Sequence, residues 1–211
     1  MLLTDKKLKR TARLYSEELA ERGILSHTDS RGGSGLTRYR ENGGTSLRVG
    51  EIIGAGKSIV TIESAWLKSG THREVILDPN WTHCGIGITR KGNSYVVVVM
   101  FTTILIKDLT VWHSEEKNKR VIKISGYFFL KYAGKIKKPL LISGVKRINA
   151  DIWDPLSGKF LFLLSRKYES PFLLIGYISL DGDLVFSAVI DVKATGSKLI
   201  DLKSSQKPCS P

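Results

Sequence analysis

Histidine and glutamate are the residues in this chain whose types could support chemistry, although they lie far apart in the sequence. His27 lies in a loop that follows a predicted helix, Glu51 follows a glycine, and His72 lies between two predicted helices. Two imidazoles and one carboxylate can share a proton, hold a water molecule or bind a divalent metal ion. The spacing His-x23-Glu-x20-His matches no local ligand motif. The residues alone therefore leave open whether these three side chains meet in space.

No other residue type strengthens a catalytic interpretation. Ser26 and Ser69 lie nearer to helix-capping positions than to a base that is oriented by a third group. The remaining histidines, His83 and His113, are expected to be surface or strand residues. The aromatic residues of the first half are expected to pack in the core: Trp66, Trp81 and Tyr95.

The two cysteines form neither a C-x-x-C pair nor a disulfide framework. Cys84 begins a predicted strand, and we expect it to be a small buried apolar residue without a nucleophilic role. Cys209 lies third from the C-terminal end, in a segment rich in Ser, Lys and Pro.

Helical and polar segments alternate in the first half of the chain. Leu8, Ala12, Tyr15 and Leu19 recur at steps of three and four, which predicts a helix that Thr4 can cap and Gly23 can end. A loop rich in Gly and Ser follows. The later predicted elements are a short helix over 36–41, a helix that begins after Ser58, a short helix over about 73–77, and a hairpin of strands 85–89 and 94–102.

From Ile104 onward, helical periodicity disappears and short strand-like runs recur between turn signals. The predicted strands are 105–112, 120–130, 139–142, 145–152, 160–165, 172–179 and 184–192. Runs of this length and number favour an antiparallel, immunoglobulin-like sandwich. We therefore expect an α+β chain with a first domain over 1–103, a β-sandwich over 104–195 and a flexible tail over 196–211.

Several motifs of the first half, taken in order, resemble those of the CAP superfamily, which includes cysteine-rich secretory proteins, antigen five and plant pathogenesis-related proteins of the first class. The bacterial, SCP-like type is the most similar. The matching pieces cover nearly all of the first hundred residues: Gly23–His27, Gly50–Ile53, Trp66–Val75 with Ile76-Leu77 after it, Trp81-Thr82, Gly85–Gly87 and Tyr95–Phe101.

The resemblance implies an α–β–α sandwich with a central cleft that can hold zinc or another divalent ion. His27, Glu51 and His72 take three of the family's four ligand positions, and the same three residues are the implied catalytic candidates. The fourth position, a glutamate in the family, is Ser69 here, and Glu63 lies near the same helix face without matching it. Ile52 stands where the family usually has Asn, and the family's first helix is not found before Leu3.

Composition limits the class of partner without identifying it. The net charge is +13, with +5 on residues 1–103 and +8 on the remainder, so the excess of cations is diffuse. A diffuse positive charge favours anionic phospholipid, glycan or nucleic acid, but no dense arginine cluster marks a nucleic-acid site. No apolar run reaches the roughly 18 residues of a membrane span. The sequence does not indicate an oligomeric state.

Two functions follow from these observations, with nucleic-acid binding as a weaker third. The first is an exported binding module for a lipid, a glycan, or an envelope or host component, whose cleft holds a divalent metal. The second is a metal-assisted hydrolase or peptidase in which Glu51 is the general base. The missing fourth carboxylate favours the first. We expect a secreted, periplasmic or surface-anchored protein whose leader is not part of this sequence, and such a protein is a lipoprotein candidate. The alternative is that the protein has no leader and stays in the cytoplasm.

Overall fold

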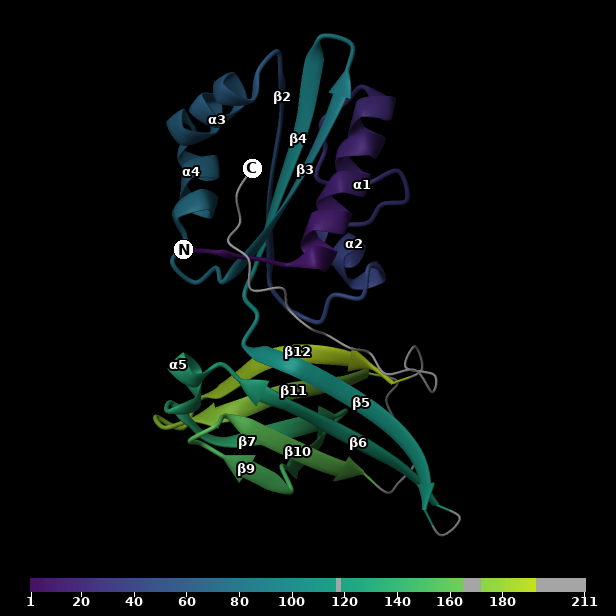
Figure 1. Cartoon of the computed structure of the whole chain (residues 1–211), viewed down its shortest axis with the longest axis vertical. Coiled ribbons are helices and arrows are strands. Elements are labelled where there is room, and N and C mark those ends of the chain that lie inside the picture. The colour runs from purple at the N-terminus through teal and green to yellow at the C-terminus, as the bar shows by residue number, and fades with distance from the viewer. Residues whose placement is uncertain (117–118, 165–171, 193–211) are drawn as a thin grey trace. The chain divides into compact units, whose positions relative to one another are not determined.

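The computed structural model describes residues 1–116, 119–164 and 172–192 (Figure 1). The chain divides into two compact units, the first from Met1 to Thr103 and the second beginning at Ile104. The tail predicted over 196–211 lies outside the described residues. Among the described residues, no helix combines the length and apolar character that crossing a bilayer requires.

The first unit is built on a four-stranded sheet with the order β1-β3-β4-β2. Only β1 and β3 run parallel to each other, and β4 is antiparallel to both β3 and β2. The strand bounds are β1 Leu3–Thr4, β2 Val49–Gly56, β3 His83–Lys91 and β4 Ser94–Thr102.

Helices cover both faces of this sheet, as Figure 1 shows. Helices α1 (Lys6–Arg22) and α2 (Gly35–Glu41) lie on one face, and α3 (Ile59–Lys68) and α4 (Gly70–Leu77) lie on the other. Val98 in β4 packs in the cluster beneath α1, and the next residue, Val99, packs in the cluster beneath α3. Strand β4 is apolar from Tyr95 to Phe101, as expected for a strand with both faces buried. This is the α–β–α sandwich that the family resemblance implies.

Helix α1 begins and ends at well-formed caps. The Asp5 side chain accepts a hydrogen bond from the Leu8 amide at 2.7 Å, so Asp5 is the N-cap, and the prediction that Thr4 caps the helix is wrong. Thr4 is part of β1 and pairs with Cys84. Gly23 ends the helix with φ of 71°, as predicted.

The second unit consists of two four-stranded antiparallel sheets with the orders β5-β6-β10-β9 and β12-β11-β7-β8. The residues between them form one apolar core with contributions from both sheets. The bounds are β5 Ile106–Glu116, β6 Lys119–Phe128, α5 Leu130–Ala133, β7 Ile136–Ser143, β8 Lys146–Asn149, β9 Ile152–Asp154, β10 Lys159–Leu164, β11 Phe172–Ser179 and β12 Leu184–Asp191.

The strand order of the second unit confirms the prediction of an immunoglobulin-like sandwich. Lettered in chain order as A, B, C, C′, D, E, F and G, the strands give A-B-E-D in one sheet and G-F-C-C′ in the other. This is the arrangement of immunoglobulin domains. The predicted strand over 145–152 is divided in two, because β8 ends at Asn149 and β9 begins at Ile152 in the other sheet. The α+β fold class is thereby confirmed.

Candidate functional site

The His27 loop connects α1 to α2 and is held in shape by Asp29. The Oδ1 atom of Asp29 accepts hydrogen bonds from the backbone amides of Arg31 at 2.9 Å and Gly33 at 2.7 Å. The Asp29 side chain is only 1% exposed. Burial alone would raise the pKa of this carboxyl. The two amide hydrogen bonds, together with the guanidinium charges of Arg38 and Arg31, outweigh burial and lower the Asp29 pKa below its ordinary value.

Arg38 lies in α2 and connects the His27 loop to the sheet. Its guanidinium donates to the backbone carbonyls of Gly33 at 2.7 Å and His27 at 3.3 Å, and to Oε2 of Glu51 at 2.6 Å. It also lies 3.4 Å above the ring centroid of Tyr15 in α1. The Arg38 side chain is 7% exposed, so its charge is buried among these partners.

Glu51 joins His27 to this buried arrangement. Its side chain lies on the α1 face of β2, on the same side as Val49 and Ile53. Oε1 of Glu51 is 2.9 Å from Nδ1 of His27, and Oε2 accepts from Arg38. The Glu51 side chain is 7% exposed, whereas the His27 side chain is 63% exposed. The result is a solvent-facing imidazole whose inner nitrogen is fixed by a buried carboxylate.

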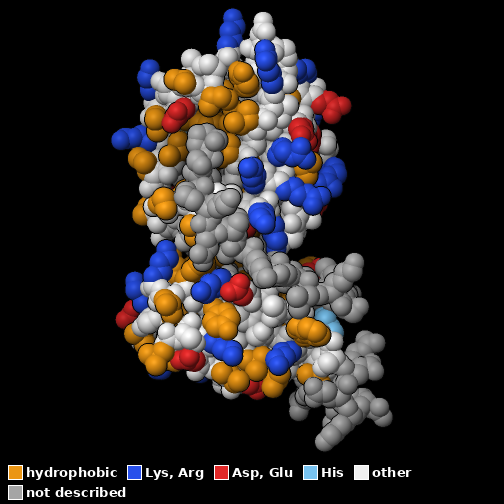
Figure 2. Space-filling model, viewed as in Figure 1, with side chains coloured by type: hydrophobic (Ala, Val, Ile, Leu, Met, Phe, Trp, Pro, Cys, Tyr) orange, Lys and Arg blue, Asp and Glu red, His pale blue; other side chains and the backbone are white. Residues whose placement is uncertain are grey.

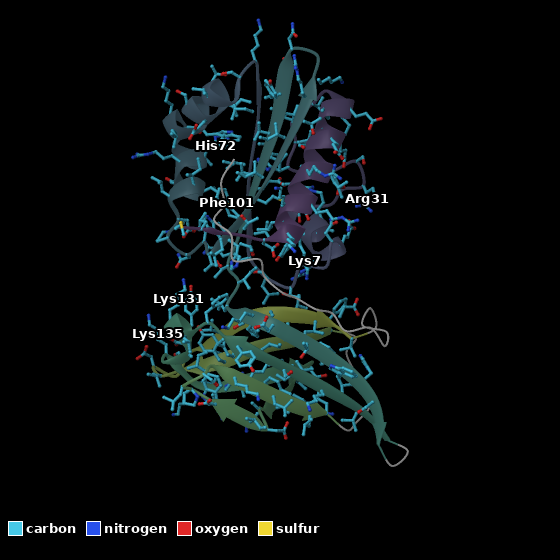
Figure 3. The ribbon with its side chains drawn as sticks, in the orientation of Figure 1. Lys7, Arg31, His72, Phe101, Lys131 and Lys135 are labelled. Atoms are coloured by element: carbon cyan, nitrogen blue, oxygen red, sulfur yellow. The ribbon has the colours of Figure 1, made fainter. Side chains whose placement is uncertain are left out.

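His72 lies in a different part of the first unit. It is in α4, which packs on the opposite face of the sheet from α1 and α2, and Figure 3 shows it beside α4. Its Nδ1 atom is 2.8 Å from Oγ of Ser69 in the preceding turn. Within the described residues, no hydrogen bond or ion pair joins His72 to His27 or Glu51.

The structure therefore brings two of the three predicted site residues together. In the part of the chain that the structure describes, no group of three or more His, Cys, Asp or Glu side chains is placed to hold a metal ion. Glu63 in α3 is exposed to solvent. Metal binding and a shared catalytic role for His27, Glu51 and His72 stay predictions.

The aromatic residues of the first half pack in its core, and the two remaining histidines lie in strands, as expected. The indole N–H of Trp66 donates to the Ile53 carbonyl at 3.0 Å, and that of Trp81 donates to the Val75 carbonyl at 2.7 Å. Both indoles belong to the core beneath α3, and Tyr95 packs against it. His83 is a fully buried residue of β3, and His113 is an exposed residue of β5.

Cys84 is buried, as expected, but it is also disulfide-bonded. The expectation of a simple apolar cysteine is therefore wrong. The chain has one other cysteine, Cys209, which lies outside the described residues. Two cysteines that are 125 positions apart give no local pattern, and only a tertiary contact can pair such a cysteine.

Arg38 and Asp29 are the site residues that the sequence interpretation missed. The signal for Asp29 is present, because an Asp followed by Ser-Arg-Gly-Gly is typical of a turn in which the carboxylate accepts nearby backbone amides. No comparable signal exists for Arg38. Arg38 and Arg40 stand in the same short helix, and only packing against Glu51 and Tyr15 separates the buried arginine from the exposed one.

Comparison with known proteins agrees with this architecture. The model of the Cysteine-rich secretory protein family, CAP, matches residues 2–101. The uncharacterized protein YkwD of Bacillus subtilis is 31% identical over 93 residues, an alignment that covers 44% of this chain and 36% of YkwD. The chain thus spans about a third of the length of that relative.

Two solved structures align with about half of this chain. An outer surface protein from Borrelia burgdorferi is 24% identical with a TM-score of 0.46, over 48% of this chain and 77% of that one. An extracellular protein containing a SCP domain from Bacillus anthracis is 23% identical with a TM-score of 0.44, over 49% and 34%. With the family match over residues 2–101, the first unit is a CAP domain of the cysteine-rich secretory protein family.

Proposed function

We propose that this protein acts outside the cytoplasm as a binding module, and that its CAP domain recognises a ligand through the exposed imidazole of His27. The observation that supports this proposal is the contact between His27 Nδ1 and Glu51 at 2.9 Å, with Glu51 itself held by Arg38. Because Nδ1 of His27 is already held by Glu51, the exposed imidazole loses little side-chain conformational entropy when it binds a ligand.

The hydrogen bond defines what His27 can offer to a ligand. Because a carboxylate only accepts hydrogen bonds, Nδ1 carries the proton in this pair, and Nε2 of the neutral ring is an acceptor. Ile24 and Leu25, which precede the loop, are 54% and 51% exposed and add apolar surface nearby in the sequence. A hydroxyl donor next to an apolar face is the chemistry of a glycan or of a lipid headgroup and chain.

The contacts of Glu51 do not suit a divalent cation. Arg38 places a positive charge 2.6 Å from Oε2, and His27 occupies Oε1. A cation bound between His27 and Glu51 would have to displace the buried guanidinium or lie against it, at an electrostatic cost. We therefore propose a binding site that works through hydrogen bonds without a resident metal ion.

The same contacts argue against the metal-assisted hydrolase. A general base must reach the proton that it removes, directly or through one water. Both carboxylate oxygens of Glu51 already accept hydrogen bonds, and its side chain is only 7% exposed. Ser26, which directly precedes His27, donates to the Thr28 carbonyl instead of to an imidazole.

Export is part of this proposal and rests on two observations. The matched family is described as one of secretory proteins. Cys84 is disulfide-bonded. Structural disulfides persist in the oxidising environments outside the cytoplasm and are rare within it. Secreted, periplasmic and surface-anchored forms all satisfy this requirement.

The imidazole signals of His27 in NMR spectra test the proposal. We would titrate the protein with a soluble glycan fragment of bacterial cell wall and, separately, with monoolein, whose glycerol headgroup carries hydroxyl donors. We expect one probe to move the His27 signals, and we expect Arg38→Gln to weaken that probe at least tenfold. The matched control is Arg40→Gln, which removes an exposed arginine from the same helix and should leave the affinity unchanged.

A second variant separates binding from folding. His27→Gln leaves the contacts of Arg38 with Glu51 and Gly33 in place, so a loss of binding in this variant identifies the imidazole as the contact. If neither probe moves the His27 signals, the binding proposal is overturned. Zinc-dependent cleavage of a peptide that disappears in Glu51→Gln would replace the proposal with the hydrolase.

A further inference from the structure

Helix α1 carries a row of four exposed cations, which we call the α1 basic stripe: Lys6, Lys9, Arg10 and Arg13. Their spacing of i, i+3, i+4 and i+7 places them along one side of the helix. Figure 2 shows Lys and Arg side chains gathered over α1 and the segments beside it. The stripe contains none of the residues that form the His27 site.

The charge of the stripe is largely uncompensated within the fold. Arg13 pairs with Glu17 at 3.1 Å, but the side chains of Lys6, Lys9 and Arg10 make no hydrogen bond or ion pair in the described part of the chain. Asp5, the acidic residue just before the helix, is buried and bonded to the Leu8 amide. Burial also raises the Asp5 pKa, which disfavours its negative form.

Apart from Arg22 in the last turn, the charges of α1 run against the helix dipole. The first turn contains no acidic residue, and the glutamates Glu17, Glu18 and Glu21 all lie in the C-terminal half. Cations at the N-terminus and anions at the C-terminus of a helix are both destabilising. Charges that oppose the helix dipole without a compensating contact are expected at a functional site. Stability of the fold therefore does not account for the stripe.

We propose that the α1 basic stripe binds a linear, phosphate-bearing polymer outside the cell. The four cations rise about 10 Å along the helix axis, which suits successive groups of an extended chain. The guanidiniums of Arg10 and Arg13 can each donate two parallel hydrogen bonds to a phosphate, and Lys6 and Lys9 add point charges. The side chains are the ligands here, since the Leu8 amide of the first turn is already bonded to Asp5.

The distribution of acidic residues favours a polymer over a bilayer. Glu17 and Glu21 are also exposed and follow the stripe along the helix. A planar anionic membrane lying against α1 would meet these carboxylates together with the cations. A linear chain that crosses the N-terminal half of the helix meets the cations alone.

Binding to long-chain inorganic polyphosphate tests this inference. The test variant combines Lys6→Gln, Lys9→Gln, Arg10→Gln and Arg13→Gln. The control removes two lysines and two arginines elsewhere in the CAP domain, through Lys57→Gln, Lys68→Gln, Arg73→Gln and Arg90→Gln, which are all exposed. We expect the wild-type affinity to fall steeply as the salt concentration rises. In the test variant the plot of log K against log salt should be less steep by about 3, or roughly 0.7 for each lost phosphate contact.

The control variant should keep a steeper salt dependence and a higher affinity than the test variant. The thermal midpoint of the test variant should equal or exceed that of the wild type, because removing cations relieves the helix N-terminus; this shows that lost binding is not lost folding. Equal affinity of the two variants would overturn the inference, because it would reduce the effect to net charge. Tighter binding to phosphatidylglycerol vesicles than to polyphosphate would also overturn it.

Discussion

Asp29 and Arg38 determine how His27 is presented, although neither touches solvent to a large extent. Asp29 shapes the loop by accepting the amides of Arg31 and Gly33, and Arg38 fastens that loop to Glu51 on β2. Buried charges are tolerated only where each has partners. The exposed imidazole therefore depends on two charged side chains behind it, of which the Asp29 carboxyl can change its protonation.

The lowered pKa of Asp29 predicts how the stability of the CAP domain depends on pH. A carboxyl whose folded pKa lies below its ordinary value contributes stability that is complete above the ordinary value of 3.8 and is lost as the pH falls through the folded pKa. Asp29→Asn should be less stable than the wild type at pH 6 and should lose less stability between pH 6 and pH 3.

Urea unfolding at the two pH values measures this difference. The indole N–H signals of Trp66 and Trp81 report on the CAP domain alone, because both residues belong to its core. Glu74→Gln, which removes an exposed carboxylate from α4, is the matched control and should keep the wild-type dependence. An equal loss of stability in Asp29→Asn and the wild type would show that Asp29 is not the titrating group.

At the scale of elements, the CAP domain depends on the close approach of α1 to β3. A Cβ atom on Gly87 would lie 2.2 Å from the backbone carbonyl of Ala12, and one on Gly85 would lie 2.3 Å from the amide nitrogen of Lys9. These obstacles are backbone atoms, which cannot rotate away as a side chain can. Two glycines in β3 thus set the depth at which α1 packs on the sheet.

Gly87→Ala should destabilise the CAP domain by about 3 kcal/mol, the upper range for overpacking a core. The helix would have to move off the sheet, which would also open the apolar cluster beneath it. Gly70→Ala is the matched control, since a Cβ there meets no atom within 4 Å and the substitution should leave the stability nearly unchanged. Denaturant midpoints of both variants measure the effect, and similar midpoints would contradict the packing argument.

At the scale of the whole molecule, the chain joins an α–β–α CAP domain to an immunoglobulin-like sandwich, each with its own apolar core. Cys84, which lies in the first of these units, is disulfide-bonded. Because Cys209 is the chain's other cysteine, we expect these two residues to be linked within one molecule.

Peptide mapping without reduction should find the Cys84 and Cys209 peptides joined, in a protein that migrates as a monomer. Cys209→Ala breaks the bond without opening a cavity at the buried Cys84, and we expect it to cost about 2 to 4 kcal/mol of stability. The wild type under reducing conditions should show the same loss. A disulfide-linked dimer on a non-reducing gel would show that the bond joins two chains.

The sequence by itself determined the class of fold and most of the elements, but not β1 or the division of the predicted strand 145–152 into β8 and β9. Periodicity locates α1, the valine-rich run of β4 and the short strands after Ile104, because backbone preference and burial pattern act over a few residues. The motifs from Gly23 to Phe101 identified the family, which the match over 2–101 confirms. Those motifs also selected His27 and Glu51, which do meet.

Tertiary structure decided which side chains share a surface. Residue spacing cannot tell that Glu51 faces α1 while His72 is carried by a helix on the opposite side of the sheet. It cannot tell that Arg38 is buried and Arg40 exposed within one helix, or that Cys84 has a disulfide partner. These facts depend on long-range packing, in which the position of each side chain is set by residues that are far away in the sequence.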